Sequence, residues 1–218
     1  MYRPFEAFDP DRRLISVIGS GGKTTLLRHL SRRLPGTVIL TTSTHIYPFP
    51  DLPLVTDLTE NAVRTALAQS RVICLGKPQP SGKLADPSGE ISFETLKALA
   101  DHVLVEADGS AGRPLKAHRP WEPVIPACSD LTVCVNGASG IGRPAAEVCH
   151  CPELFCALAG TSPDAPVQVE DIARVIDREG LADWVLVNQT DALSDPSQAQ
   201  RLCDLISAPA SPCALAPR

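Results

Sequence analysis

The stretch LISVIGSGGKTTLLRHL, residues 14–30, decides the fold that this chain is expected to adopt. Residues 14–18 are mostly apolar and rich in β-branched side chains, which is typical of a buried strand. Residues 26–30 carry leucines at helical spacing, so the glycines between the two runs lie on a strand-to-helix turn. Such a turn binds phosphate well, because glycines let backbone amides approach an anion and the start of a helix adds unpaired N–H groups.

The residues of this turn have separate expected roles. Lys23 is expected to reach the β- and γ-phosphates of a nucleotide and to act in catalysis, and the Thr24 hydroxyl is expected to ligate Mg²⁺. The turn is two residues shorter than the Walker A spacing requires, and in this it resembles the phosphate loop of the Mur ligases. A glycine turn without function is the alternative, and the Lys-Thr-Thr that follows argues against it. The predicted nucleotide-binding loop comprises Gly19, Ser20, Gly21, Gly22, Lys23, Thr24 and Thr25.

Composition limits the class of protein. The chain has 218 residues, 44% of them hydrophobic, which is enough to fill a core. Its net charge of −5 argues against nucleic-acid binding through a basic face. No run approaches the ~18 apolar residues of a membrane span, and Met1–Arg12 lacks the pattern of a signal peptide. The eight cysteines form no Cys-x-x-Cys pair, so we expect a protein of the reducing cytoplasm without nucleic-acid or membrane partners.

Apolar runs that alternate with helical patterns predict the architecture. Strands are expected at 14–18, 37–42, 71–75, 102–106, 131–135 and 184–188, and helices at 23–34, 58–69, 92–100, 145–159 and 169–179. Such alternation predicts an α/β fold, a P-loop-type three-layer sandwich with a mostly parallel sheet flanked by helices. We expect one P-loop-like nucleotide-binding domain over residues 14–218, preceded by an N-terminal extension, residues 1–13. Ligands bind such sheets beyond the carboxyl ends of the strands.

Two acids follow the strand predicted at 102–106. Glu106 and Asp108 are two residues apart and share one face if the strand continues through them. Hard cations take carboxylate oxygens, so both acids are predicted, with Thr24, to hold Mg²⁺, and both are predicted to be catalytic. A strand end followed by a turn-forming Asp-Gly is the alternative.

Basic residues gather directly after these acids. A chain that is acidic overall has four potentially cationic side chains here, which suits a second anionic group, either a transferred phosphate or an acidic substrate. An exposed basic loop is an equally good interpretation. The predicted substrate-binding residues are Arg113, Lys116, His118 and Arg119.

A polar turn also follows the strand predicted at 184–188. Its sequence, Asn188-Gln189-Thr190-Asp191, resembles the Asn-Lys-x-Asp element of guanine-nucleotide proteins, with Gln189 in place of the lysine. Asn188 and Asp191 are therefore predicted to bind the nucleotide. The missing lysine weakens the case for guanine, so ATP and GTP remain alternatives, and an Asx-type turn is the plain interpretation.

Four further segments allow two interpretations each. Thr41–His45 faces the γ-phosphate or caps the next element. The loop 76–89 is a solvated linker or a lid that brings Lys77 or Lys83 over the phosphates. Gly137–Gly142 is better explained as a tight turn near the ligand than as a dehydrogenase loop. Cys149-His150-Cys151, with Cys156, has donors for zinc, but the spacing does not guarantee a tetrahedral site.

Taken together, these motifs resemble those of the YqeC family. The resemblance extends from about Leu14 to Asp191 and rests on the stretches 17–25, 41–45, 105–110, 122–126 and 188–191. It implies an accessory protein in the maturation of a selenium-dependent molybdenum hydroxylase or of its cofactor, with a molybdopterin-type cofactor or the hydroxylase as partner. The expected activity is that of a Mg²⁺-dependent nucleoside triphosphatase or phosphotransferase. An ATP-dependent ligase with a Mur-like loop and a nucleotide-gated binding module are the alternatives.

Overall fold

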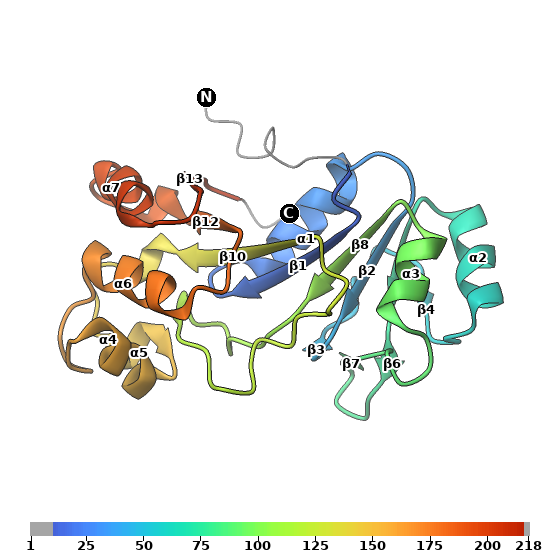
Figure 1. Ribbon diagram of the computed structural model, residues 1–218, viewed down its shortest axis with the longest axis horizontal. Coiled ribbons are helices and arrows are strands. Elements are labelled where there is room, and N and C mark those ends of the chain that lie inside the picture. The colour runs from blue at the N-terminus through green and yellow to red at the C-terminus, as the bar shows by residue number, and fades with distance from the viewer. Residues whose placement is uncertain (1–10, 216–218) are drawn as a thin grey trace.

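The computed structural model describes residues 11–215 (Figure 1). An eight-stranded sheet of order β13-β12-β10-β1-β8-β2-β5-β4 forms its centre, and every pairing in this sheet is parallel. The α/β three-layer prediction is confirmed, whereas residues 1–10 of the predicted N-terminal extension lie outside the described part. The strands are β1 (Leu14–Gly19), β2 (Val38–Thr42), β4 (Leu54–Val55), β5 (Val72–Leu75), β8 (His102–Glu106), β10 (Leu131–Gly137), β12 (Trp184–Asn188) and β13 (Ala210–Pro212).

Side chains alternate between the two faces of each strand, which explains why helices pack on both faces of the sheet. Ile15 and Val17 of β1 face α1 (Lys23–Arg33) and join one core with its leucines. Ile18 points to the other face and packs in a second core with α5 (Pro152–Ala159), α6 (Val169–Glu179) and α7 (Ser197–Leu205). A third core on that face contains residues of α2 (Glu60–Gln69) and α3 (Phe93–Leu99). Figure 1 shows α2 and α3 at one end of the row of strands and α4–α7 at the other.

The prediction of one helix over residues 145–159 is wrong. The structure instead has α4 (Ala145–Val148), the short strand β11 (Cys149–His150) and α5. Strand β11 pairs in parallel with β9 (Leu115–Lys116), and Cys151 adopts a left-handed conformation with φ 62° before Pro152 begins α5. Proline suits the first position of a helix and disfavours a helical residue before it, so the helical pattern is interrupted there.

The loop predicted at 76–89 contains a small hairpin. Strands β6 (Lys77–Pro78) and β7 (Leu84–Ala85) are antiparallel, and β7 also pairs with β3 (His45–Ile46). The hairpin therefore belongs to a three-stranded sheet beside the main one. Helix α7, strand β13 and the short helices η1 (Ala138–Gly140) and η2 (Thr190–Ala192) complete the part of the chain that the structure describes.

The parallel sheet brings the predicted motifs to one edge. The carboxyl ends of β1, β2, β8, β10 and β12 lie next to one another there, because the strands run in the same direction. No helix within residues 11–215 is long and apolar enough to cross a membrane.

Candidate functional site

A cavity of about 530 Å³ opens at this edge of the sheet. Residues 21–25 of the glycine loop form one wall, and Glu106 with residues 109–113 forms another. The third wall comes from the small sheet and its neighbours, namely His45, Ile46, Tyr47 and Lys83, with Gln189 closing the side near η2. Of the two lysines considered for a lid, Lys83 lines the cavity and lies 5.0 Å from the centre of the Tyr47 ring, whereas Lys77 pairs with Glu90 at the surface.

Close packing explains the glycines of the loop. Gly21 has φ 85°, and a Cβ atom there would lie 2.4 Å from the backbone nitrogen of Gly137. Gly22 has φ 130°, and a Cβ atom there would lie 2.4 Å from Nδ2 of Asn188. Both positions therefore need glycine for conformation and for space. Gly137 belongs to the segment expected to form a tight turn near the ligand, and its N–H donates to the carbonyl of Pro114 at 2.9 Å.

Lys23 is buried and tied to Asp108. Its Nζ lies 2.9 Å from Oδ1 of Asp108, and it donates to the carbonyl of Gly19 at 2.7 Å and to Oγ of Ser110 at 3.3 Å. The backbone N–H of Gly19 donates to Oδ2 of Asp108 at 2.8 Å. The carboxylate of Asp108 thus fixes both the first residue of the loop and the lysine at its end.

Two more cations contact the same carboxylate. His118 Nε2 lies 2.7 Å and Lys116 Nζ 3.4 Å from Oδ2 of Asp108. Lys116 also pairs with Glu122, and His118 Nδ1 lies 2.8 Å from Oε2 of Glu179 at the end of α6. With His118 protonated, the three cations balance the three carboxylates in this buried network. Asp108 and Lys116 are almost completely inaccessible to solvent.

The pKa values reflect this arrangement. Burial raises the pKa of Asp108, but the hydrogen bond from His118 and the charges of Lys23 and Lys116 outweigh it and lower the pKa to about 2. Burial likewise lowers the pKa of His118, but its hydrogen bonds to Asp108 and Glu179 outweigh burial, so the net shift is upward. The two shifts agree in sign, since each partner stabilises the charged form of the other.

Thr24 and Glu106 form the second pair at the loop. The Thr24 hydroxyl donates to Oε2 of Glu106 at 3.2 Å, and Glu106 ends β8 beside the cavity. Burial raises the pKa of Glu106. Thr42, at the end of β2, donates to the backbone carbonyl of Glu106 at 2.7 Å and so holds the strand end in place. Hydroxyl and carboxylate oxygens are the kind of ligand that Mg²⁺ prefers, and these two are close enough to share one ion.

The four basic residues after β8 do not form one cluster. Arg113 lines the cavity, and its carbonyl accepts a hydrogen bond from the Ser20 hydroxyl. Lys116 and His118 are buried in the ionic network around Asp108. Arg119 is exposed and lies 5.8 Å from the centre of the Trp121 ring. Of the predicted substrate-binding residues, therefore, Arg113 is the one with access to the cavity.

The polar turn after β12 contacts the glycine loop through its first residue, Asn188. Asn188 Nδ2 donates to the carbonyl of Gly21 at 2.8 Å, and Asn188 Oδ1 accepts from the backbone of Leu215 at 2.8 Å. Gln189 lines the cavity and accepts a hydrogen bond from Ser139 at 2.6 Å. Asp191 is exposed and does not line the cavity, and its role in base recognition stays a prediction.

Sequence reasoning missed three members of the site. Glu179 contacts a histidine that is 61 residues away in the chain, and nothing in the local pattern of α6 indicates this. Glu122 lies six residues after Lys116, and its place in a mixed loop gave no sign of an ion pair. Ser110 follows the Asp-Gly turn directly, and its position beside Lys23 could have been inferred from the Glu-Ala-Asp-Gly-Ser stretch.

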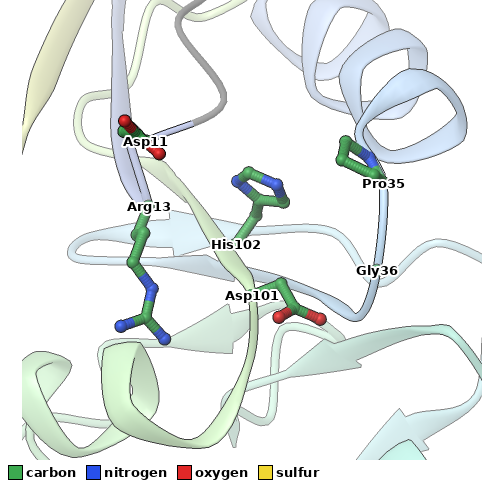
Figure 2. A pocket seen from close by; sticks show the side chains of 6 residues that line it. All are labelled: Asp11, Arg13, Pro35, Gly36, Asp101 and His102. Carbon is green, nitrogen blue, oxygen red and sulfur yellow. The ribbon is translucent and has the colours of Figure 1, made fainter.

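A second hollow, of about 350 Å³, lies at the opposite edge of the sheet (Figure 2). Figure 2 shows Asp101 and His102 at the start of β8 with Asp11, Arg13, Pro35 and Gly36 around them. Asp101 accepts from the backbone and hydroxyl of Thr37 at 2.7 and 2.8 Å, and Arg13 donates to the carbonyl of Ala100 at 2.9 Å. These charged groups hold the amino ends of the strands together, so we place the functional site at the other edge.

The part of the chain that matches known proteins includes the glycine loop and the acidic end of β8. Residues 15–153 match the family model described as YqeC protein. A relative from Escherichia coli strain K12, described as "Uncharacterized protein YqeC", is 33% identical over 171 residues. That match spans 75% of this chain and 67% of the relative.

Proposed function

This chain belongs to the YqeC family, and from that premise we propose that it binds a nucleoside triphosphate with Mg²⁺ at the loop 19–25 and cleaves or transfers the γ-phosphate. The reaction would serve the maturation of a selenium-dependent molybdenum hydroxylase or of its cofactor, in the cytoplasm. ATP and GTP are both candidates for the nucleotide.

One observation carries the nucleotide proposal. The Thr24 hydroxyl and the Glu106 carboxylate are 3.2 Å apart where two walls of the cavity meet, one of them formed by the glycine loop. Thr24 would hold Mg²⁺ directly and Glu106 would hold it through water, and the ion would neutralise charge on the phosphates. The loop amides and the start of α1 favour an anion at the same place.

Lys23 already uses the donors of its ammonium group. Its three contacts are with Gly19, Asp108 and Ser110, and an ammonium has three N–H groups. A phosphate oxygen must therefore replace one of them. The contact with Ser110 is the longest of the three, so we expect the ammonium to exchange Ser110 for phosphate while Asp108 keeps the side chain in place.

Asp108 suits a positioning role better than the predicted catalytic and metal-binding roles. Both of its oxygens contact cations, and a carboxylate with a pKa of about 2 is a weak base near neutral pH. Glu106, with a raised pKa and a place at the cavity, is the better candidate for orienting an attacking water or acceptor hydroxyl.

The contacts that occupy the Asp108 carboxylate favour a second candidate function. A site whose Asp108 is occupied and whose chemistry depends on Glu106 can bind nucleotide and turn it over slowly, which suits a nucleotide-gated module that docks on a hydroxylase. The two functions differ in whether phosphate is released.

Phosphate release under single-turnover conditions tests the proposal. Protein in excess over ATP or GTP, with Mg²⁺, should release inorganic phosphate or pass it to an acceptor. Glu106→Gln should slow this step by about 10²–10³-fold and change nucleotide affinity much less, because an orienting carboxylate acts mainly in the transition state.

Glu90→Gln, at an exposed carboxylate that pairs with Lys77, is the matched control and should react like the wild type. Tight binding without release would favour the gated module, and ADP formation that requires a second substrate would favour a ligase. Equal rates in the wild type and in Glu106→Gln would contradict the assignment of Glu106.

A further inference from the structure

The segment Cys149-His150-Cys151 has donors for a metal, and the structure divides them between two environments. Cys149 on β11 and Cys156 on α5 are buried in the apolar core to which α5 and α6 contribute. His150 and Cys151 instead lie beside Glu122, and one ligand atom from each of these three side chains lies within 4.8 Å of the other two. The donor set therefore differs from the one that the cysteine spacing alone suggests.

We propose that Glu122, His150 and Cys151 form a zinc site, separate from the nucleotide cavity. Thiolate, imidazole and carboxylate are the ligand types that Zn²⁺ takes, at about 2.0–2.3 Å. Tetrahedral coordination at these bond lengths puts the ligand atoms about 3.3–3.8 Å apart. Side-chain rotations that move the ligand atoms by about an ångström would therefore complete the site. Three protein ligands leave a fourth position for water or for an anionic ligand, as in catalytic zinc sites.

Backbone hydrogen bonds hold the two contributing segments together. Strand β11 pairs with β9 so that His150 lies opposite Lys116, and the Ala117 N–H donates to the His150 carbonyl at 3.2 Å. Glu122 lies on the loop that follows β9, and its N–H donates to the carbonyl of Arg119 at 3.0 Å. His150 therefore has a fixed backbone position, because a ligand on a paired strand is placed more precisely than one on a free loop.

Lys116 is the competitor for one of the three ligands. Its ammonium group, which is almost completely inaccessible to solvent, pairs with Oε2 of Glu122. A carboxylate has two oxygens, so Oε1 of Glu122 can ligate the metal while Oε2 stays paired with Lys116. Lys116 would then orient the Glu122 carboxylate without contacting the metal. Zn²⁺ with one thiolate and one carboxylate is neutral overall. Because the Cys151 thiol releases one proton when the metal binds, the site gains one positive charge, which an anionic fourth ligand would offset.

Titration with Co²⁺ alone and with Zn²⁺ alone tests this proposal on the full chain. Co²⁺ reports a bound thiolate through a charge-transfer absorption band and reports four-coordination through its visible bands. Zn²⁺ affinity is measured by competition with a chromophoric chelator. Cys151→Ser, His150→Gln and Glu122→Gln remove one ligand each, and circular dichroism checks the fold of every variant.

Two cysteine variants serve as matched controls. Cys149→Ala removes the neighbouring thiol that faces the core, and Cys128→Ala removes a half-buried thiol on a different loop. We expect one Co²⁺ per wild-type chain with a thiolate band, and the same result for both controls. Cys151→Ser should lose the band, and each ligand variant should weaken Zn²⁺ binding by roughly tenfold or more.

The proposal is wrong if the wild type shows no thiolate band, if Cys151→Ser keeps the band, or if Cys128→Ala loses it. Should Cys151→Ser fail to fold, the wild-type spectrum and the Zn²⁺ affinity of His150→Gln decide. Unchanged Zn²⁺ affinity in a folded His150→Gln would contradict the proposal as well, because it would remove His150 from the ligand set.

Discussion

At the scale of single residues, Asp108 organises the site. Its carboxylate contacts Lys23, Lys116, His118 and the backbone N–H of Gly19. Removing one member of a buried ion pair typically costs about 3–5 kcal/mol, because the remaining charge is left without compensation. The loop that we assign to phosphate is therefore preorganised by a network that extends through His118 to Glu179 on α6.

His118 makes the stability of this network depend on pH. Its pKa is raised above the ordinary value of 6.5, so the protonated form stabilises the folded state below about pH 6.5, and this contribution is lost as pH rises through the raised pKa. The pKa of Asp108 is lowered to about 2, so its contribution is present above its usual value of 3.8 and is lost only in strong acid. Of these two groups, His118 is therefore the one whose titration changes stability above pH 6.5.

We predict that His118→Asn removes part of the pH dependence of stability. Urea unfolding at about pH 6 and about pH 9 should show the wild type losing more free energy of unfolding between the two than the variant loses. The variant should be destabilised most at the lower pH. The same difference between the two pH values in both proteins would show that His118 is not the titrating group.

At the scale of elements, the loop between β8 and β10 supplies several parts of the site. Residues 109–113 line the cavity, Lys116 on β9 and His118 enter the ionic network, and Arg119 reaches the surface. The composition of this loop indicated cations near the acids, but it contains nothing that separates Arg113 from Arg119. Only the path of the backbone distinguishes them.

The two arginines should therefore differ in function. Arg113→Ala removes a cation from the cavity and should impair hydroxylase maturation in a strain that lacks the native protein. Arg119→Ala removes an exposed side chain that rests on Trp121 and should support maturation fully. Hydroxylase activity in the complemented strains measures both. Full activity with Arg113→Ala and loss with Arg119→Ala would place the anion site on the outer surface instead.

The helices and strands also show how much of this fold can be predicted from the sequence. The strands predicted at 14–18, 37–42, 71–75, 102–106, 131–135 and 184–188 all occur, because runs apolar on both faces are characteristic of buried parallel strands. The interruption at Cys151 and the helix α7 were missed. In the first case Pro152 begins a new helix and β11 pairs with β9, which together interrupt the helical pattern. In the second a mostly polar first turn, residues 197–200, conceals the apolar face of the helix.

At the scale of the whole molecule, the parallel sheet explains why the sequence could place the motifs together. Strands that run in one direction bring the ends of β1, β8 and β12 to one edge, so the glycine loop, Glu106 and Asn188 meet there. Contacts between side chains far apart in the chain, such as His118 with Glu179, depend on how α6 packs on the sheet. Patterns along the chain carry no information on such packing.

The central claim is that the loop 19–25 binds a nucleoside triphosphate with Mg²⁺, and equilibrium titration tests it most directly. Calorimetric titration of ATP and of GTP, with and without Mg²⁺, should show binding to the wild type that Mg²⁺ strengthens. Lys23→Met keeps the buried apolar stem and removes the charge, and Lys77→Met, at an exposed lysine, is its matched control.

We expect Lys23→Met to bind at least about tenfold more weakly, since a hydrogen bond to a charged group contributes roughly 1.5–3 kcal/mol. Lys77→Met should bind like the wild type. No binding of either nucleotide to the wild type, or equal affinity in a natively folded Lys23→Met, would contradict the claim.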